Sequence, residues 1–160
     1  LVLVQEQIKI GWEVEVCYLK NDPELMQEFI DAGARVNAQA ANQSVIKQIL
    51  TLRKISRSQS SIIHAHLPQS ELFMAIVSKR KNFLVTRHNS EEFYPTSFRW
   101  LSRVLAKFVA RRAVRIITIS DAVTEFNISH KPIKSFKQLQ RCRVDLSVYK
   151  KEYPFNQRPL

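Results

Sequence analysis

The chain has 160 residues, which suits about one domain, and its 45% of hydrophobic residues is enough for a packed core. No apolar run approaches the roughly 20 residues that would cross a bilayer as a helix. The net charge is +11, and the charged residues are distributed unevenly along the chain. Residues 1–50 hold 4 of the 25 Lys and Arg residues and 7 of the 14 Asp and Glu residues. Residues 51–160 hold the remaining 21 basic and 7 acidic residues. This asymmetry indicates an anionic partner.

Glycine and cysteine counts exclude further classes of site. The only two glycines, Gly11 and Gly33, rule out a glycine-rich loop that would cradle a phosphate. Cys17 and Cys142 lie far apart and predict neither a disulfide framework nor a metal site. The short apolar start of the chain has no basic region and no cleavage signal, so we expect no signal peptide and a cytoplasmic location.

Hydrophobic periodicity predicts strands and helices that alternate along the chain with short connections. The expected elements, in order, are a helix over 1–10, a strand over 13–19, a helix over 21–33, a strand over 34–38, a helix over 42–57, a strand over 60–66, a helix over 68–81, a strand over 82–86, a helix over 97–112, a strand over 114–120 and a helix from residue 121. After about residue 130 we expect one strand near 133–139 and a basic tail. Such alternation is typical of a parallel sheet with helices on both faces, a Rossmann-like α/β fold.

Three consecutive predicted strands end in polar side chains. Because the carboxyl ends of parallel strands meet at one edge of a sheet, where ligands bind, these side chains predict a shared cleft. The residues concerned are His64 and His66, then Thr86, Arg87, His88 and Asn89, then Thr118 and Ser120.

Two catalytic uses of these side chains are disfavoured. His64, His66 and His88 could bind a metal as in barrel hydrolases, but the chain is too short for a barrel and has no well-placed set of carboxylates, so we predict no metal. A nucleophilic triad lacks its G-x-S-x-G turn and a histidine near either cysteine. Histidine and arginine at strand ends can instead hold phosphate or sugar hydroxyls.

Four motifs, in this order and at these separations, resemble the N-terminal domain of the family 4 retaining glycosyltransferases, which have the GT-B fold: "IIHAHLPQSELF", "FLVTRHNSEEF", "IITISDAV" and "RVDLSVY". The resemblance covers roughly residues 1–150. It implies a Rossmann-like, acceptor-side domain over residues 1–142, with residues 143–160 as the start of an interdomain linker or a basic tail. By the same comparison, we expect the family's first strand and its glycine-containing loop to be missing.

The resemblance also implies an activity and its residues. The reaction is transfer of a sugar from a nucleotide-sugar, the donor substrate, to an acceptor hydroxyl with retention and without a cofactor or metal. The acceptor is a sugar or a lipid-linked molecule, as in the synthesis of cell-envelope polysaccharides or glycolipids. By motif match, His88 takes the place of the catalytic histidine that faces the donor sugar and its phosphate. The substrate-binding candidates are His66, Glu71, Arg87 and Asn89 in the cleft and Ser120 at its edge.

Two departures from the family pattern affect these expectations. Arg143 stands where the family has a glycine before Val144 and Asp145, and arginine tolerates a left-handed turn poorly. The donor-binding C-terminal domain, with its paired glutamates, is absent from the chain. We therefore predict that this chain alone does not catalyse transfer.

A basic amphipathic helix is expected over 97–112. Arg99, Arg103, Lys107 and Arg111 recur at i, i+4 spacing, and an apolar set that includes Leu101, Val104, Leu105 and Phe108 is expected on another face. Such a helix suits anionic lipid headgroups and would make the protein peripheral on the cytoplasmic face of a membrane. A helix that packs in the core with a solvated basic face is the simpler reading.

The alternative function is a non-catalytic, basic α/β module that binds an anionic membrane surface or nucleic acid. The charge permits nucleic-acid binding. However, the sequence shows no helix-turn-helix, zinc finger or aromatic RNA-binding strand, so nucleic acid is the less favoured partner. The sequence does not indicate an oligomeric state.

Overall fold

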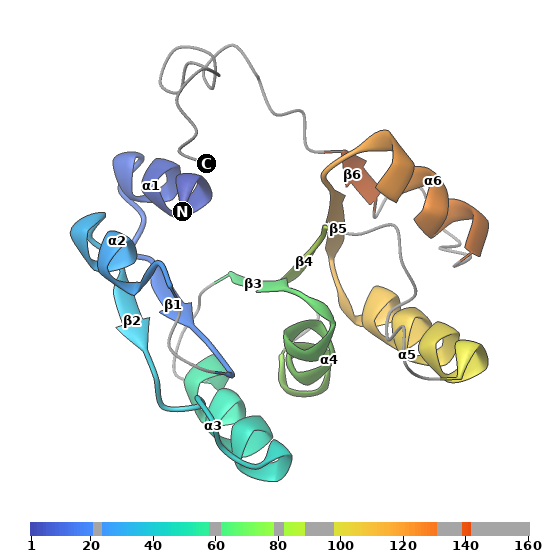
Figure 1. The fold of residues 1–160 in the computed structure, drawn as a ribbon, viewed down its shortest axis with the longest axis horizontal. Helices are drawn as coiled ribbons and strands as arrows, with labels where there is room; N and C mark the ends of the chain where they lie inside the picture. Colours follow the sequence, from blue (N-terminus) through green and yellow to red (C-terminus); the bar gives the residue numbers. More distant parts are fainter. Residues whose placement is uncertain (21–23, 58–61, 79–81, 89–97, 131–138, 142–160) are drawn as a thin grey trace, which may run out of the picture. The chain divides into compact units, whose positions relative to one another are not determined.

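The computed structural model describes residues 1–20, 24–57, 62–78, 82–88, 98–130 and 139–141 (Figure 1). The chain divides into two compact units. The first comprises residues 1–61 with residues 76–78, and the second comprises residues 62–75 with residues 79–160.

The first unit contains a short parallel β-pair and three helices. Val16 of one strand lies opposite Val36 of the other, and Asn37 donates a side-chain hydrogen bond of 2.6 Å to the carboxylate of Glu15 across the pair. The elements in chain order are α1 (Val2–Lys9), β1 (Glu15–Cys17), α2 (Met26–Asp31), β2 (Arg35–Asn37) and α3 (Val45–Arg57).

Two residues explain how this unit connects its elements. Gly33 has φ of +90°, which a glycine adopts without strain, and it ends α2 immediately before β2. Gln48 of α3 is 2% exposed, and its amide donates to the carbonyls of Leu19 and Ala40 at 2.7 and 3.1 Å. A single buried amide therefore holds α3 to the segments that follow both strands.

The second unit is built on a four-stranded parallel sheet in the order β3-β4-β5-β6. Each strand lies beside the one that precedes it in the chain. Its elements are β3 (Ile63–His66), α4 (Pro68–Val77), β4 (Phe83–Arg87), α5 (Arg99–Arg112), β5 (Arg115–Thr118), α6 (Asp121–His130) and β6 (Leu139–Arg141), with the last residues of α4 grouped in the first unit.

The strand order places the connecting helices of the second unit on one face of its sheet. Parallel crossovers are right-handed, and here each one steps in the same direction along the sheet. Figure 1 accordingly shows α4, α5 and α6 on the same side of β3, β4 and β5. The other face of the sheet carries no helix from these crossovers.

The core of the second unit lies between the sheet and these helices. Phe83, Val85 and Ile116 are fully buried on neighbouring strands, and Val109 is fully buried on α5. Two further contacts join neighbouring elements within each layer. Arg112 at the end of α5 donates to the Ala75 carbonyl of α4 at 2.8 Å, and the Val114 amide donates to the Phe83 carbonyl at 2.8 Å.

The expected fold class is confirmed, because parallel strands alternate with helices over most of the predicted ranges. The last strand is found at Leu139–Arg141. The sequence predicted it near 133–139, so the two ranges share only residue 139. Residues 133–138 lie outside the described residues. The predicted linker or tail over 143–160, with Arg143, Val144 and Asp145, also lies outside them. Within the described part of the chain, no helix has the length and apolarity needed to cross a bilayer.

Replacing the most buried aromatic residue tests this core. Phe83 is 0% exposed, so Phe83→Ala leaves a cavity under β4 and should lower the free energy of unfolding by about 3–5 kcal/mol. Val104→Ala, at a position that is 53% exposed on α5, should change it by no more than about 0.5 kcal/mol. Urea denaturation of the two variants measures both values, and equal stability in them would contradict the assigned core.

Candidate functional site

Histidines from two neighbouring strands gather on the sheet face opposite α4, α5 and α6. In the β3–β4 register, His64 lies beside Leu84 and His66 beside Thr86. Side chains alternate along a strand, so His64, His66, Thr86 and then His88 share one face. The fully buried Phe83 and Val85 of β4 occupy the opposite, helix-covered face.

Two short hydrogen bonds order this histidine cluster, which we define as His64, His66, Thr86 and His88. His64 Nε2 lies 2.6 Å from the Thr86 hydroxyl, and His66 Nδ1 lies 2.9 Å from His88 Nε2. The ring centroids are 4.4 Å apart for His64 and His66 and 5.2 Å apart for His66 and His88. His88 is exposed, whereas His64 and His66 are half-buried.

The environment keeps the two strand histidines neutral. Burial, and to a smaller extent the neighbouring His64 and His88 rings, lower the pKa of His66 to about 4. Burial, and then His88, also lowers the pKa of His64 below its ordinary value. At neutral pH both rings are therefore uncharged, each with one nitrogen that donates and one that accepts.

The contact between His66 and His88 constrains the ring of His88. One hydrogen bond joins His66 Nδ1 and His88 Nε2. One of these two nitrogens carries the proton and donates, and the other accepts. Because His66 is neutral, its Nδ1 can either donate to His88 or accept from it. The opposite nitrogen of His88, Nδ1, is then the atom left to face a ligand.

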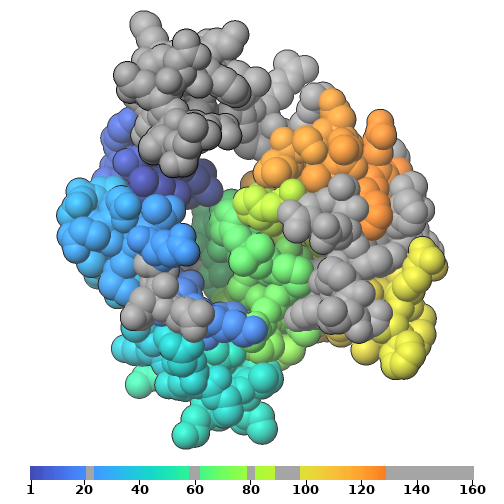
Figure 2. Space-filling model, viewed as in Figure 1, coloured from blue at the N-terminus to red at the C-terminus, as the bar shows by residue number. Residues whose placement is uncertain are grey.

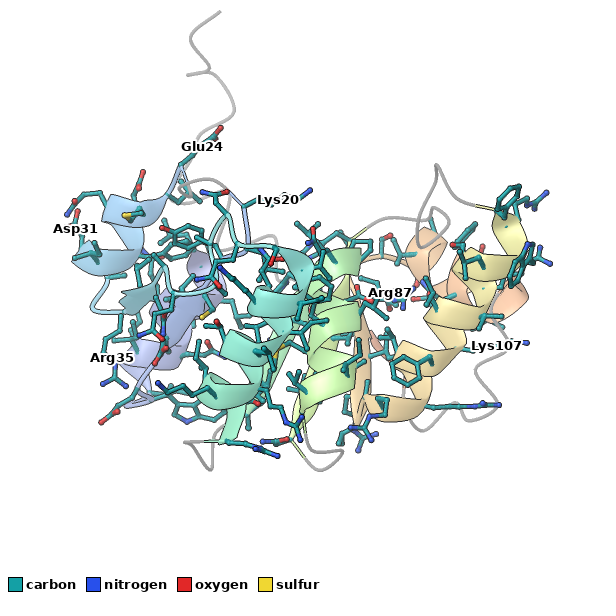
Figure 3. All side chains as sticks on the ribbon, turned by 90° about the horizontal axis from the view of Figure 1, so that it is seen from below. Lys20, Glu24, Asp31, Arg35, Arg87 and Lys107 are labelled. Carbon is teal, nitrogen blue, oxygen red and sulfur yellow. The ribbon has the colours of Figure 1, made fainter. Side chains whose placement is uncertain are left out.

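A buried ion pair lies on the other side of the same strand end. Arg87 Nη2 is 3.0 Å from the Glu71 carboxylate, and the two side chains are 7% and 3% exposed. Burial lowers the pKa of the Arg87 guanidinium, while the Glu71 carboxylate beside it opposes that change. Figure 3 shows Arg87 inside this unit. The pair joins the last residue of β4 to the first turn of α4.

The third strand end forms a capped helix start. The Ser120 hydroxyl accepts a hydrogen bond of 3.3 Å from the Val123 amide, as an N-cap residue does. Behind it, the fully buried Thr118 hydroxyl lies 2.7 Å from the Thr124 hydroxyl, which in turn donates to the Ser120 carbonyl at 2.9 Å. These contacts hold the carboxyl end of β5 against α6.

One structural feature next to the histidine cluster was not predicted from the sequence. Leu67, between His66 and α4, has φ of +73°, which costs a residue with a side chain about 1–3 kcal/mol. The Ser70 hydroxyl donates to the carbonyls of both His66 and Leu67 and supports this turn. Glycine would be the usual signal for such a turn, and the sequence has none there. The Pro68 that follows Leu67 was the only local sign of a sharp change in direction.

The structure thus sorts the predicted site residues into groups. His66 and His88 are in direct contact, and Glu71 and Arg87 are in contact with each other beneath them on the other face of the sheet. Ser120 lies at the end of β5. Asn89 lies outside the described residues.

Among the residues that the structure describes, no three His, Cys, Asp or Glu side chains form a group that could hold a metal ion. In the histidine cluster, one nitrogen of each ring is directed at Thr86 or at another ring of the cluster.

A parallel α/β fold with polar side chains gathered at the carboxyl ends of its strands is of the Rossmann-like class. Comparison with known proteins makes this assignment specific. The sequence profile described as Glycosyltransferase Family 4 matches residues 1–138, and the chain belongs to that family. No curated protein matches the sequence. Family membership confirms the resemblance carried by the strand-end motifs and supports a glycosyltransferase-type function.

Breaking the buried ion pair should be costly. Glu71→Leu leaves the Arg87 guanidinium buried without this carboxylate and should lower the free energy of unfolding by about 3–5 kcal/mol. Adding Arg87→Met should restore part of that loss. The matched control is the exposed pair of Glu6 and Lys9, 2.6 Å apart, where Glu6→Gln should cost no more than about 1 kcal/mol. Denaturation curves that place both single variants within 1 kcal/mol of the parent would contradict a buried pair.

The pKa of His66 predicts how stability depends on pH. Since its folded value is about 4 against an ordinary 6.5, the unfolded chain binds more protons between these values. The contribution of His66 to stability is therefore complete above about pH 6.5 and is lost as the pH falls towards 4. NMR titration of the ring protons measures this directly, with the urea-unfolded chain as the control. If His66 titrated in the folded chain at nearly the same pH as in the unfolded chain, the half-buried environment described for its ring would be wrong.

Proposed function

We propose that the chain is the acceptor-side part of a glycosyltransferase that moves a hexose from a nucleotide-sugar to an acceptor hydroxyl with retention of the anomeric configuration. Family membership supports the sugar-transfer class. The observation that carries the assignment of the site is the exposed His88 imidazole, which is oriented at the end of β4 by a 2.9 Å contact with a neutral His66.

We assign His88 to the donor sugar and its phosphate. A preorganised hydrogen-bond donor aimed at a place where charge develops stabilises a transition state without the cost of reorganisation. In transfer from a nucleotide-sugar, negative charge develops on the leaving phosphate, and an imidazole N–H can donate to the sugar or to that phosphate. The exposure of His88 leaves it accessible to such a ligand, and His66 limits the orientations that its ring can adopt.

The remaining candidates divide between contact and support. We propose His66 and Asn89 as cleft-lining residues and Ser120 as the edge of the cleft. The side chains of Glu71 and Arg87 are 3% and 7% exposed. We therefore propose that these two residues support the site by fixing the backbone from which His88 projects. A rigid strand end holds a functional group more accurately than a loop does.

The acceptor and the place of reaction belong to the same proposal. Acceptors of this enzyme class carry hydroxyls on sugars or on lipid-linked molecules, so we propose a role in the synthesis of a cell-envelope polysaccharide or glycolipid. We place the reaction in the cytoplasm and assign it no cofactor.

The chain alone should not catalyse transfer, because the residues that would bind the nucleotide are expected on a second domain. The purified 160-residue chain, incubated with labelled nucleotide-sugars and candidate acceptors, should give no product above that of a heat-unfolded sample. Turnover by the native chain alone would contradict this division of the site.

The proposed role of His88 is tested in a protein in which this chain is joined to a donor-binding domain. There, His88→Ala should lower kcat/KM for transfer about 100–1,000-fold, the usual cost of removing one positioned donor. Glu125→Ala, an exposed position on α6, is the matched control and should leave the rate within twofold of the parent. NMR of the product should show the anomeric configuration of the donor. An unchanged rate with His88→Ala, or an inverted product, would overturn the proposal.

A further inference from the structure

The outward face of α5 combines two stripes that differ in chemistry. Arg99, Arg103, Lys107 and Arg111 form a basic stripe at i, i+4 spacing, and all four are exposed. Next to it lies an apolar stripe of Trp100, Val104 and Phe108, which are 65%, 53% and 38% exposed. With 3.6 residues per turn, the two stripes lie side by side on the solvent half of the helix.

The inward face of α5 explains why these apolar residues remain outside. Ser102, Ala106 and Val109 are the buried residues of the helix, so its contact with the core is made by small side chains. The sequence predicted Val104 and Phe108 on another face than the basic stripe, and both are exposed there. Apolar side chains that are exposed next to one another, rather than singly, are typical of an interaction surface.

Three of the four cations on this face have no ion-pair partner among the residues that the structure describes. The sequence of α5, residues 99–112, contains five basic residues and no acidic one. Arg112 turns inward and donates to the Ala75 carbonyl, but among the described residues Arg103, Lys107 and Arg111 form no ion pair. Figure 3 shows Lys107 pointing away from the helix, and Figure 2 shows part of α5, in yellow, at the surface.

We propose that this outward face of α5 docks the protein on an anionic lipid bilayer. Basic side chains next to a surface of acidic headgroups each contribute favourably, and Trp and Phe prefer the boundary between headgroups and acyl chains. Phe98, 75% exposed directly before the helix, extends the apolar stripe. The helix is 14 residues long, so it lies in the interface rather than across it.

Charge alone would suit nucleic acid as well, but the apolar stripe favours lipid. Val104 and Phe108 sit in the middle of the helix among the basic residues, where a phosphate backbone would leave them in water. A bilayer removes them from water in the same contact that pairs the cations with headgroups. The proposal rests on α5 only, and it is independent of the proposed transfer reaction.

The test measures binding of the folded chain to vesicles of phosphatidylcholine with about one-quarter phosphatidylglycerol, by co-sedimentation. Arg103→Glu, Lys107→Glu and Arg111→Glu together should lower the partition coefficient at least about 100-fold, at roughly fivefold for each basic residue lost. The matched control reverses three exposed basic residues of α3, Lys47→Glu, Arg53→Glu and Lys54→Glu, with the same change in net charge. It should weaken binding less than about tenfold. Equal losses in the two variants would overturn α5 as the docking surface.

A second pair of variants tests the apolar stripe without changing charge. Trp100→Ala with Phe108→Ala should lower partition about tenfold or more. Ile46→Ala with Leu50→Ala, which removes apolar side chains that are 73% and 59% exposed on α3, is the control and should leave it nearly unchanged. Full binding by the α5 variant would show that only charge acts and would overturn the proposal. All these positions are on the surface, and circular dichroism confirms that each variant folds.

Trp100 also reports its own position. The sequence has two tryptophans, so Trp12→Phe leaves Trp100 as the single emitter. Its fluorescence should shift to shorter wavelength on binding vesicles and be quenched by brominated acyl chains. Unshifted emission from vesicle-bound protein, or tighter binding to RNA than to vesicles at the same salt concentration, would contradict docking by this face.

Discussion

The buried ion pair of Glu71 and Arg87 is the interaction on which the arrangement of the site depends. A charge taken out of water destabilises the fold unless a partner of opposite sign meets it in good geometry. Here the two partners are the last residue of β4 and a residue in the first turn of α4. The end of β4 can therefore adopt few positions relative to α4 without separating these charges.

The position of the next residue follows from this constraint. Arg87 points to the helix-covered side of the sheet, so His88 projects to the opposite side, where His66 meets it at 2.9 Å. His66 itself ends β3 immediately before the left-handed turn at Leu67 and the start of α4. One helix start thus supports both histidines: it anchors Arg87 through Glu71 and continues directly from the strand that carries His66.

The sequence was sufficient for the fold class and for the sheet edge that the candidate residues share, but not for the geometry among those residues. Buried parallel strands are short apolar runs, and Ile63, Phe83 and Ile116 mark three of them clearly. The polar residues that follow predicted a shared edge. Side chains alternate between the two faces of a strand, but the sequence does not specify which face the helices cover. It therefore did not show that Arg87 lies on the helix-covered face with Glu71. Periodicity also could not show that α5 packs through Ser102 and Ala106 and leaves Phe108 outside.

The proposed docking surface and the histidine cluster belong to one parallel unit. α5 follows β4 in the chain and leads into β5, and the Arg112 and Val114 hydrogen bonds tie its end to α4 and to β4. A bilayer that holds α5 therefore also holds the strand ends at a fixed height above the lipid. That arrangement suits an acceptor that is itself anchored in the membrane, and it would give one unit both the attachment and the acceptor-side chemistry.

The central claim is that His88 is oriented by a hydrogen bond to a neutral His66, and the most direct test is the coupling across that bond. In the folded chain with nitrogen-15-labelled histidine, we expect a through-bond NMR coupling between His66 Nδ1 and His88 Nε2. It should disappear in His66→Ala and persist in Glu125→Ala. Detection would establish the contact that positions the proposed catalytic ring. If no coupling is seen, and the His88 ring shows the same tautomer mixture in the parent and in His66→Ala, the account of the site is wrong.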